Sequence, residues 1–397
     1  MFKSFFLGGF ECATGYNSRR EWIDQVAATQ HDRFAEQDYE LLRRAGIYAA
    51  RESVRWPLVD QHGKHDFSSV RPFLRAAQEN GVEVIWDLFH YGYPEGVDLF
   101  SEEFPRRFAD YCYAAARYIA ARTDGTCYFT PVNEPSYFSW AAGHAGVFAP
   151  YEKERGLELK IALIRAAIQG IDAIRGACPG ARIVNVDPIC HVAPPLGRED
   201  LQPEADDFNH RCVMQSWDML AGRLYPELGG SPEHLDIVGV NYYWTNQWEL
   251  NQPGKQIREG DPRYLPLHRL LLRVWERYGH EILITETAHR DDERPVWMRQ
   301  LARECERTLD AGVPLRGACL YPILGMPEWH DQEEWTRMGL WDLIPHCETG
   351  HLERIPYRPM ARELQEARRL DHRLHHRLEE QEALDELEAE EREAVAV

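Results

Sequence analysis

Two glutamates lie at the ends of short apolar or β-branched segments. Glu134 occurs in TPVNEP at 130–135, and Glu286 occurs in ILITETA at 282–288. Paired carboxylates facing one cleft can cleave a glycosidic bond, because one protonates the leaving oxygen while the other attacks or stabilises the oxocarbenium-like carbon. A separation of about 5–5.5 Å gives retention and a wider one gives inversion. The alternative is that one or both glutamates are salt-bridged structural acids.

Other polar residues also end β-like runs. The segments are Arg51-Glu52-Ser53, Asp87 to His90, Asn133-Glu134, Asn241-Tyr242-Tyr243 and Thr285-Glu286-Thr287. In a parallel barrel the carboxyl ends of the strands open onto one shared pocket. A purely structural barrel does not need so many polar groups there, because each must find a partner when it is buried. We therefore expect two acids, one Arg, one His, two Asn and a Tyr from these segments to converge on a site.

The elements that would position these residues alternate along the chain. Eight strands are predicted, at Phe5–Phe10, Ile47–Ser53, Val82–His90, Thr126–Asn133, Arg182–Asp187, Asp236–Tyr243, Glu281–Thr285 and Arg316–Tyr321. Helical patterns fill most gaps, at Ala35–Ala45, Val70–Asn80, Phe104–Arg122, Leu157–Ala177 and Pro295–Ala311. This alternation predicts an α/β fold, a single (β/α)8 TIM barrel. The competing fold is a doubly wound open sheet, which usually has fewer strands and often a Gly-rich phosphate loop that we do not find.

The chain is divided here into a barrel over 1–361 and a charged helical tail, partly disordered, over 362–397. The stretches Asn185–Pro232 and Asn246–Arg263 are rich in loop residues, and they follow the fifth and sixth predicted strands on the expected active-site face. Residues 371–397 hold ten acids and three Arg, a net charge of −7 (3 − 10). Two interpretations of the tail stay open: a final barrel helix with a solvated acidic extension, or a packing or homodimerisation helix.

Composition excludes several classes of partner. The formal net charge of −20 argues against nucleic acid and against an anionic membrane surface. No run approaches the roughly 20 apolar residues of a membrane span. The apolar run at the N-terminus is too short for the hydrophobic region of a signal peptide. The nine cysteines are odd in number and include no C-x-x-C pair. They predict free thiols in a reducing, cytoplasmic location.

No metal site or cofactor is predicted. His62 and His65 are close in sequence, and residues 372–376 read HRLHH, but neither group has a convincing third ligand.

Six segments together resemble glycoside hydrolase family 1, the β-glucosidase-like family of retaining (β/α)8 barrels. TPVNEP resembles its T-[LF]-N-E-P, ILITETA its I-T-E-N-G, and ARESVRWP at 50–57 its R-F-S-I-S-W-P. The others are DLFHYGYPEG at 87–96, GHAGVFAP at 143–150 and DIVGVNYYW at 236–244. The resemblance covers roughly residues 5–345 and implies the same fold.

The resemblance also implies roles at the matching positions. Glu134 would be the acid/base and Glu286 the nucleophile. Asn133 would bind the sugar 2-hydroxyl, while Arg51 and Tyr243 would hold Glu286 ionised and oriented. The implied substrate-binding residues are His90, Asn241, Glu328, Trp329, Tyr321 and Glu11.

The sequence departs from the family mainly around the sugar. GGFECATG at 8–15 stands where the family has Q-I-E-G, so a Gln that grips sugar hydroxyls is absent, and whether Glu11 substitutes for it stays open. Gly92 replaces an Asp, Tyr321 replaces a Trp, and Thr287-Ala288 replaces Asn-Gly. The chain therefore fits either a divergent branch or a sister family of the same clan, and the substitutions can change which sugar is accepted.

These observations together predict a retaining β-glycoside hydrolase that forms a covalent glycosyl-enzyme intermediate. Its expected partner is a β-linked glycoside or oligosaccharide. Two alternatives remain: a transglycosidase that uses the same intermediate, and a non-catalytic sugar-binding barrel.

Overall fold

Eight parallel strands close into a barrel in the computed structural model, which describes residues 2–368 and residue 371. The strands are β1 (Phe6–Gly9), β4 (Ala49–Ser53), β7 (Glu83–Asp87), β8 (Tyr128–Thr130), β9 (Arg182–Pro188), β11 (Ile237–Asn241), β14 (Ile282–Thr287) and β15 (Leu315–Leu320). Each overlaps one predicted strand. The ring closes between β1 and β15, where Phe6 pairs with Ala318. The predicted (β/α)8 fold is confirmed.

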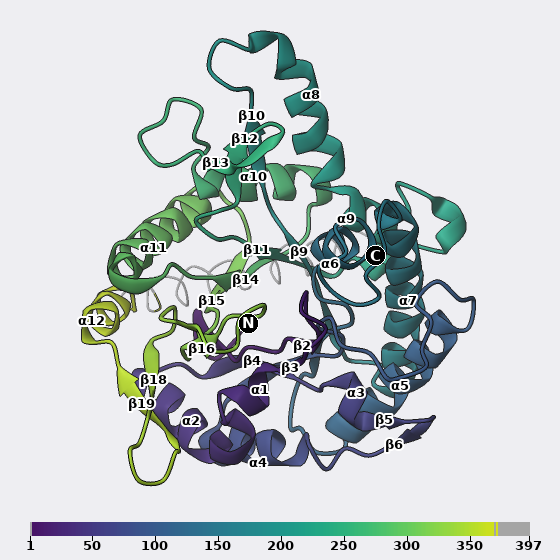
Figure 1. Cartoon of the computed structure of the whole chain (residues 1–397), viewed down its shortest axis with the longest axis vertical. Helices are drawn as coiled ribbons and strands as arrows, with labels where there is room; N and C mark the ends of the chain where they lie inside the picture. Colours follow the sequence, from purple (N-terminus) through teal and green to yellow (C-terminus); the bar gives the residue numbers. More distant parts are fainter. Residues whose placement is uncertain (1, 369–370, 372–397) are drawn as a thin grey trace, which may run out of the picture.

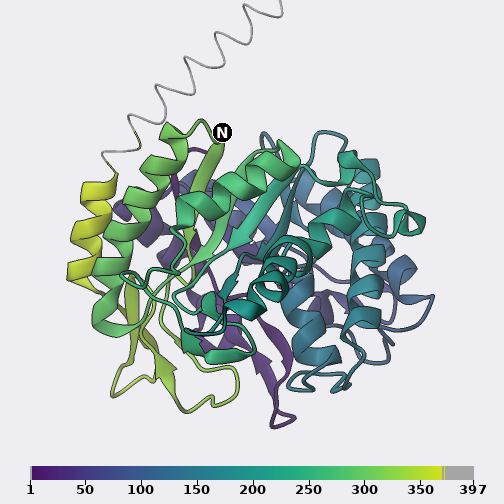
Figure 2. The same cartoon turned by 90° about the horizontal axis from the view of Figure 1, so that it is seen from above.

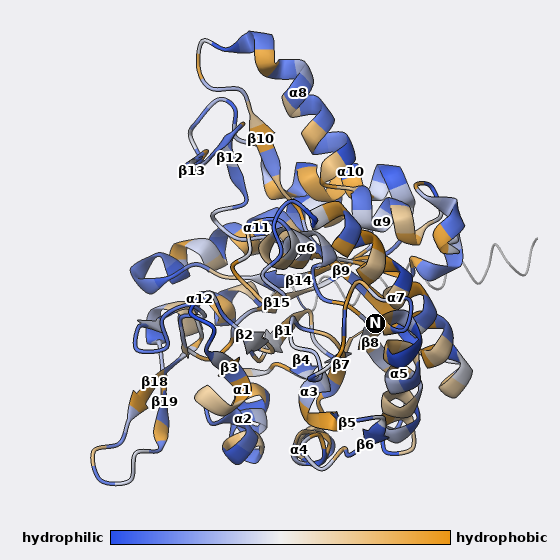
Figure 3. Ribbon diagram, turned by 45° about the vertical axis from the view of Figure 1, so that its right-hand side comes forward, coloured by the Kyte–Doolittle hydropathy of each residue, from blue (hydrophilic) through white to orange (hydrophobic). Residues whose placement is uncertain are grey.

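Helices surround this ring (Figure 1). They include α2 (His31–Ala45), α4 (Arg71–Asn80), α5 (Phe104–Ala120), α7 (Gly156–Ala177), α10 (Leu267–Tyr278) and α11 (Arg294–Asp310). Five of these six match predicted helices, and α10 was not among those named. Figure 3 shows hydrophobic residues along the strands and hydrophilic ones along the outer helices and loops. The main core therefore lies between the ring and the helices, as the alternation predicted.

A second, smaller core fills the barrel itself. Because successive side chains of a strand point to opposite faces, alternate residues enter the interior. Leu7, Ala49, Ile85 and Leu283 belong to this inner cluster, together with Tyr321 at the end of the eighth strand. On β4 the same alternation points Arg51 inward and Glu52 toward the helices. Arg51 therefore contacts Glu286 inside the barrel, whereas Glu52 contacts His31 on α2.

The stretch 185–232 is more structured than predicted. It contains α8 (Gln202–Asp207), a π-helical segment at Phe208–Cys212, and α9 (Gln215–Leu220). Strand β10 (His191–Ala193) pairs with β12 (Gln247–Glu249), which pairs with β13 (Gln252–Gln256). This small sheet and α8 extend from one side of the barrel (Figure 1). The short elements were missed because each has too few residues for a periodic pattern.

Four short two-stranded antiparallel sheets lie outside the barrel. They are β2 (Thr14–Tyr16) with β3 (Trp22–Asp24), β5 (Asp60–Gln61) with β6 (Lys64–His65), β16 (Met326–Pro327) with β17 (Trp335–Thr336), and β18 (Trp341–Pro345) with β19 (Leu352–Pro356). One further helix, α6 (Pro135–Gly143), follows β8 and begins directly after Glu134.

Helix α12 (Arg358–Ala367) crosses the predicted boundary between residues 361 and 362. It packs against α11, and Figures 1 and 2 show the yellow α12 beside the green α11. Residues 362–367 thus belong to the helical layer of the barrel. The remainder of the predicted tail lies outside the described residues, apart from 368 and 371. Within the described part, no helix has the length and apolar content to cross a membrane, and all nine cysteines are unpaired.

Candidate active site

The predicted catalytic residues meet at the carboxyl ends of the strands. Arg51 lies on β4, and Glu134 lies in the loop after β8, directly before α6. Glu286 lies on β14. In the ring, β8 and β14 are separated by β9 and β11. All three side chains are buried, with relative exposures of 0%, 8% and 4% in that order. They form one connected polar cluster, described below from its centre outward.

Arg51 is the centre of the cluster. Its Nη1 donates to Oε1 of Glu286 at 2.5 Å, and its Nη2 donates to Oδ2 of Asp87 at 2.6 Å and to Oδ1 of Asn133 at 2.5 Å. A buried guanidinium needs such partners, because its charge is costly to remove from water. Its planar fork also fixes the relative positions of the acceptors. Arg51 therefore orients residues that come from β7, from the segment after β8 and from β14.

Two donors hold the Glu286 carboxylate. Arg51 binds Oε1, and the hydroxyl of Tyr243 donates to Oε2 at 2.8 Å. Tyr243 comes from the loop after β11, and burial with the nearby charge of Glu286 raises its pKa well above the usual value. The phenol thus stays protonated and remains a donor. Both contacts predicted for Glu286 are present.

Glu134 has a different environment. Its Oε2 accepts a hydrogen bond from the hydroxyl of Tyr91 at 2.7 Å, and its Oε1 accepts one from Nδ2 of Asn241 at 2.8 Å. No described cation pairs with it. Burial and the negative charge of Glu286 raise the pKa of Glu134 to about 8. Glu134 is therefore protonated at neutral pH, as an acid catalyst requires.

Asn241 connects the two glutamates. It is the register partner of Glu286 in the pairing of β11 with β14, while its side-chain amide binds Glu134. Its Oδ1 accepts from Oγ1 of Thr285 at 2.6 Å, which fixes the orientation of the amide. One short side chain thus links the strand beside Glu286 to the carboxyl of Glu134. The two acids lie in the same site.

The predicted sugar-binding residues on the β1 side form a buried group. Nε2 of His90 lies 3.8 Å from Oε1 of Glu11, and the hydroxyl of Tyr321 donates to the same oxygen at 3.3 Å. His90 also contacts Asp87 through Nδ1 at 2.9 Å and Asn133 through Nε2 at 3.2 Å. Burial lowers the pKa of His90, but the charge and hydrogen bond of Asp87 together with the charges of Glu11 and Glu286 outweigh burial, and the pKa is raised. This group adjoins the cluster around Arg51.

Glu328 and Trp329 lie farther out, and both are half-buried. The Trp329 ring is 5.5 Å from the Tyr91 ring and 5.9 Å from the Phe148 ring, between ring centres. Trp329 therefore stands on the Glu134 side of the site. Burial raises the pKa of Glu328, opposed by the positive charge of Arg290.

Two departures from the family have packing explanations. A Cβ on Gly92 would come within 2.2 Å of Oγ1 of Thr14, so an Asp does not fit where this chain has glycine. A Cβ on Gly9 would come within 2.1 Å of Cδ2 of Tyr321. The β1 glycine thus gives the Tyr321 ring its position beside Arg51, whose guanidinium carbon is 5.3 Å from the ring centre.

Sequence reasoning did not assign Asp87 or Tyr91 to the site. Asp87 ends the third predicted strand, and that position was a usable signal because polar strand ends face the pocket. Tyr91 follows His90 in the next loop and has a left-handed backbone with φ 72°. That unusual conformation directs it toward Glu134, and nothing in the sequence indicates it.

Within the described residues, one group could present three ligand atoms to a metal ion: Cys12, Asp87 and His90. The guanidinium of Arg51 already contacts Asp87 at 2.6 Å. A cation there would face a buried positive charge, so the group fits an ion-pair network better than a metal site.

No family model matches the chain. A curated relative, the aryl-phospho-beta-D-glucosidase BglC of Bacillus subtilis (strain 168), is 23% identical, over 77% of this chain and 79% of the relative. The structure is also similar to a family 1 b-glucosidase from Thermotoga maritima in complex with isofagomine lactam. That match has a TM-score of 0.73 and 16% identity, and it covers 92% of this chain and 98% of that one.

A second Thermotoga maritima structure is a beta-glucosidase in complex with N-octyl-5-deoxy-6-oxa-N-(thio)carbamoylcalystegine. Its TM-score is 0.73 at 17% identity, with 93% of this chain and 99% of that one covered. These similarities confirm the predicted barrel and the resemblance to a family 1 β-glucosidase.

Proposed function

We propose that this protein is a retaining β-glycoside hydrolase with Glu286 as nucleophile and Glu134 as acid/base. The observation that carries the proposal is the contrast between two carboxyls of one site. Arg51 and Tyr243 hold Glu286 as an oriented carboxylate. Glu134 receives only neutral donors and has a pKa of about 8. Environments that separate two acids in this way suit one nucleophile and one proton donor.

The reaction follows from these positions. Glu286 attacks the anomeric carbon as the bond to the leaving oxygen breaks, and Glu134 gives its proton to that oxygen. The resulting Glu134 carboxylate then takes a proton from water, whose oxygen attacks the same carbon and releases Glu286. Arg51 and Tyr243 keep Glu286 in place through both steps. An alcohol or a sugar hydroxyl that replaces water would give transglycosylation through the same intermediate.

The substrate class is a β-linked glycoside or oligosaccharide, which the glucosidase activity named for the relatives supports. Asn133 would bind the 2-hydroxyl, because its Oδ1 is held by Arg51 next to Glu286. The remaining proposed sugar contacts are His90, Asn241, Glu328, Trp329, Tyr321 and Glu11. We further propose a cytoplasmic location, since nine unpaired cysteines suit a reducing compartment.

The test is turnover of a panel of aryl β-glycosides that differ in the sugar. We expect hydrolysis of at least one, with product of retained anomeric configuration by NMR. Addition of methanol separates hydrolysis from transglycosylation, because a transglycosidase gives the methyl glycoside as its main product. Inverted product would overturn the mechanism. If no glycoside turns over while a sugar still binds the Glu286→Ala variant unchanged, the protein is a binding barrel.

The acid/base assignment is tested by the leaving group. Glu134→Ala should reduce kcat for phenyl glycosides by about 10³-fold or more, and much less for 2,4-dinitrophenyl glycosides, which leave without a proton. Equal losses for both would contradict the role of Glu134.

A further inference from the structure

A second buried acid, Asp187, is bound to the segment that carries Glu134. It lies near the end of β9 and is fully buried. Its Oδ1 accepts the backbone N–H of Ser136 at 3.0 Å, and its Oδ2 accepts the Ser136 hydroxyl at 2.5 Å. Ser136 is two residues after Glu134. Neither the chemistry above nor the family resemblance gives Asp187 a role.

These contacts occur at the first turn of α6. The first N–H groups of a helix have no partner within it, and an acidic side chain is a favourable acceptor for them. Glu134 precedes the helix, and Pro135 has no N–H, so Ser136 presents the first helical N–H. Asp187 binds this N–H from another element, which fixes the start of α6 to the barrel.

The backbone of Glu134 needs such support. Its φ of 46° and ψ of 59° lie in the left-handed region, which is costly for a residue with a side chain. Its own N–H donates to the carbonyl of Val186 at 3.1 Å. Val186 and Asp187 therefore hold the segment on both sides of Glu134 from adjacent positions on one strand.

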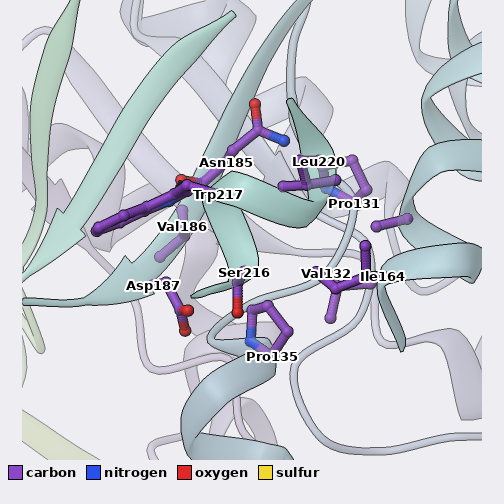
Figure 4. Close-up of a pocket in the computed structure, with 11 residues that line it drawn as sticks. Pro131, Val132, Pro135, Ile164, Asn185, Val186, Asp187, Ser216, Trp217 and Leu220 are labelled. Atoms are coloured by element: carbon purple, nitrogen blue, oxygen red, sulfur yellow. Dashed lines mark hydrogen bonds between the residues drawn. The ribbon is translucent and has the colours of Figure 1, made fainter. Parts of the chain in front are cut away.

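Asp187 does not touch the substrate region directly. It lines a cavity of about 10 Å³ together with Pro135, Ser216 and Trp217, which Figure 4 shows in close-up. That volume is at the lower limit for a single water molecule. A sugar cannot enter it, so any effect of Asp187 on catalysis has to pass through α6 and through its charge.

The titratable groups around Asp187 come from several elements. The positive charge of Lys160 on α7 acts on Asp187, and the thiol of Cys190 after β9 also interacts with it electrostatically. The Lys160 ammonium donates to Oε1 of Gln215 at 2.7 Å. Burial raises the pKa of Asp187 to about 6, although Lys160 and the two serines Ser136 and Ser216 lower it. Above that pH Asp187 carries a negative charge. The titratable groups that face Glu134 itself are Tyr91, Tyr137, Cys190, Asp187, Tyr243 and Glu286.

We propose that Asp187 is a positioning residue for the acid/base: it anchors the start of α6, which holds Glu134 in its strained conformation, and its negative charge acts on the Glu134 carboxyl. The catalytic part of this inference rests on the proposed function. The charge of Asp187 contributes to the raised pKa of Glu134, after burial and Glu286. Asp187 thus helps Glu134 keep its proton at neutral pH.

Two variants separate the anchor from the charge. Asp187→Asn has the same shape and can still accept the Ser136 N–H, so it removes mainly the charge. Asp187→Ala removes both. The matched control is Asp218→Asn on α9, another buried acid, which is bonded to Arg277 and does not face Glu134.

The first measurement is the titration of Glu134 by ¹³C NMR of glutamate-labelled protein, with the Glu134 signal identified by its absence in Glu134→Gln. We expect Asp187→Asn to lower the pKa of Glu134 by about 0.5 unit or more, and Asp218→Asn to leave it unchanged. An unchanged Glu134 titration in Asp187→Asn would overturn the proposed role of the charge. This readout needs no turnover, so it stays informative if the proposed hydrolase activity is absent.

The second measurement is kcat. Asp187→Ala should lose about tenfold or more on phenyl glycosides because Glu134 is misplaced, with a smaller loss on 2,4-dinitrophenyl glycosides. Equal losses on both substrates would show general destabilisation and overturn the anchoring role. If the wild-type protein turns over no glycoside but the NMR shift is present, the proposed function fails while the coupling of Asp187 to Glu134 stands.

Discussion

The hydroxyl of Tyr91 lies 2.7 Å from Oε2 of Glu134. The ring that carries this hydroxyl is fixed, because it stacks on Phe138 with 5.3 Å between ring centres and meets the Trp329 ring edge-on at 5.5 Å. A neutral donor at this distance stabilises the ionised carboxyl and so lowers the pKa of Glu134, against the larger effects of burial and Glu286. Tyr91 therefore lowers the pKa of Glu134, whereas the charge of Asp187 raises it.

Tyr91→Phe removes this donor and keeps the ring. We expect the pKa of Glu134 to rise by about 0.5 unit, so the alkaline limb of kcat/KM for phenyl glycosides moves to higher pH. The pH profile measures the shift directly. Tyr111→Phe is the control, since that buried hydroxyl donates to the carbonyl of Leu88 outside the site. A limb that moves to lower pH would contradict the role of the hydrogen bond.

The wild-type pH profile follows from the raised pKa of Glu134. In the proposed mechanism Glu134 must be protonated to assist the leaving group, so turnover of phenyl glycosides should fall as the pH rises through about 8. Activity on 2,4-dinitrophenyl glycosides should fall less there, because those substrates need little proton transfer. The comparison of the two profiles on one preparation is the measurement. Identical alkaline limbs would assign the titration to another group.

The proposed covalent intermediate predicts a site of labelling. An activated 2-deoxy-2-fluoro glycoside of an accepted sugar should inactivate the protein and add its mass to the peptide that contains Glu286. Glu286→Gln should not be labelled and should lose about 10⁴-fold or more of kcat. Glu304→Gln serves as the control, because that buried acid binds His268 away from the site. A label on any other residue would remove the nucleophile role from Glu286.

A buried ion-pair network between β4 and α2 predicts that the stability of the protein depends on pH. Nδ1 of His31 lies 2.8 Å from Asp38 and its Nε2 lies 2.8 Å from Glu52, while Arg354 also binds Asp38. Burial lowers the pKa of His31, but Glu52 and Asp38 outweigh burial and raise it to about 9. The folded pKa exceeds the unfolded value of about 6.5, so the protonated form is favoured by folding.

This stabilisation is fully present below pH 6.5 and is lost as the pH rises through 9. We expect His31 to contribute up to roughly 3 kcal/mol to the loss of unfolding free energy over that range. Urea unfolding at several pH values measures it, with His31→Gln flattening the slope and His65→Gln leaving it intact. An undiminished slope in His31→Gln would show that other groups cause it.

Close packing at Gly9 predicts a cost for the smallest added side chain. Gly9→Ala would place a methyl group against Tyr321, which is held by Cys12 and Glu11 and cannot move freely. We expect a loss of about 1–3 kcal/mol in unfolding free energy and weaker sugar binding. Gly180→Ala is the control, since its Cβ would meet nothing within 4 Å. Equal stability of the two variants would contradict this packing argument.

The strand pattern alone located all eight barrel strands, because strand formation depends on local runs of apolar and β-branched residues. It also placed Glu134 and Glu286 at strand ends, where barrel geometry brings side chains together. The same reasoning described 185–232 as mainly loop and missed α8 and α9. Six-residue helices are too short to show a period, and contacts such as that of Trp217 with the carbonyl of Asn185 stabilise them.

By itself, then, the sequence determined the barrel, its order of elements and the two candidate acids. The family resemblance placed Arg51 and Tyr243 beside Glu286, but the contacts themselves and the groups around Glu134 were decided by tertiary structure. Arg51 meets Glu286 across 235 positions of chain, and Asp187 meets Ser136 across 51. The local sequence pattern predicts which face of a strand a side chain lies on. The residues that it contacts depend on the closure of the ring and on loop conformations such as the left-handed backbone of Tyr91. Those partners set the proton affinity of Glu134, because burial and neighbouring charges act through space rather than along the chain.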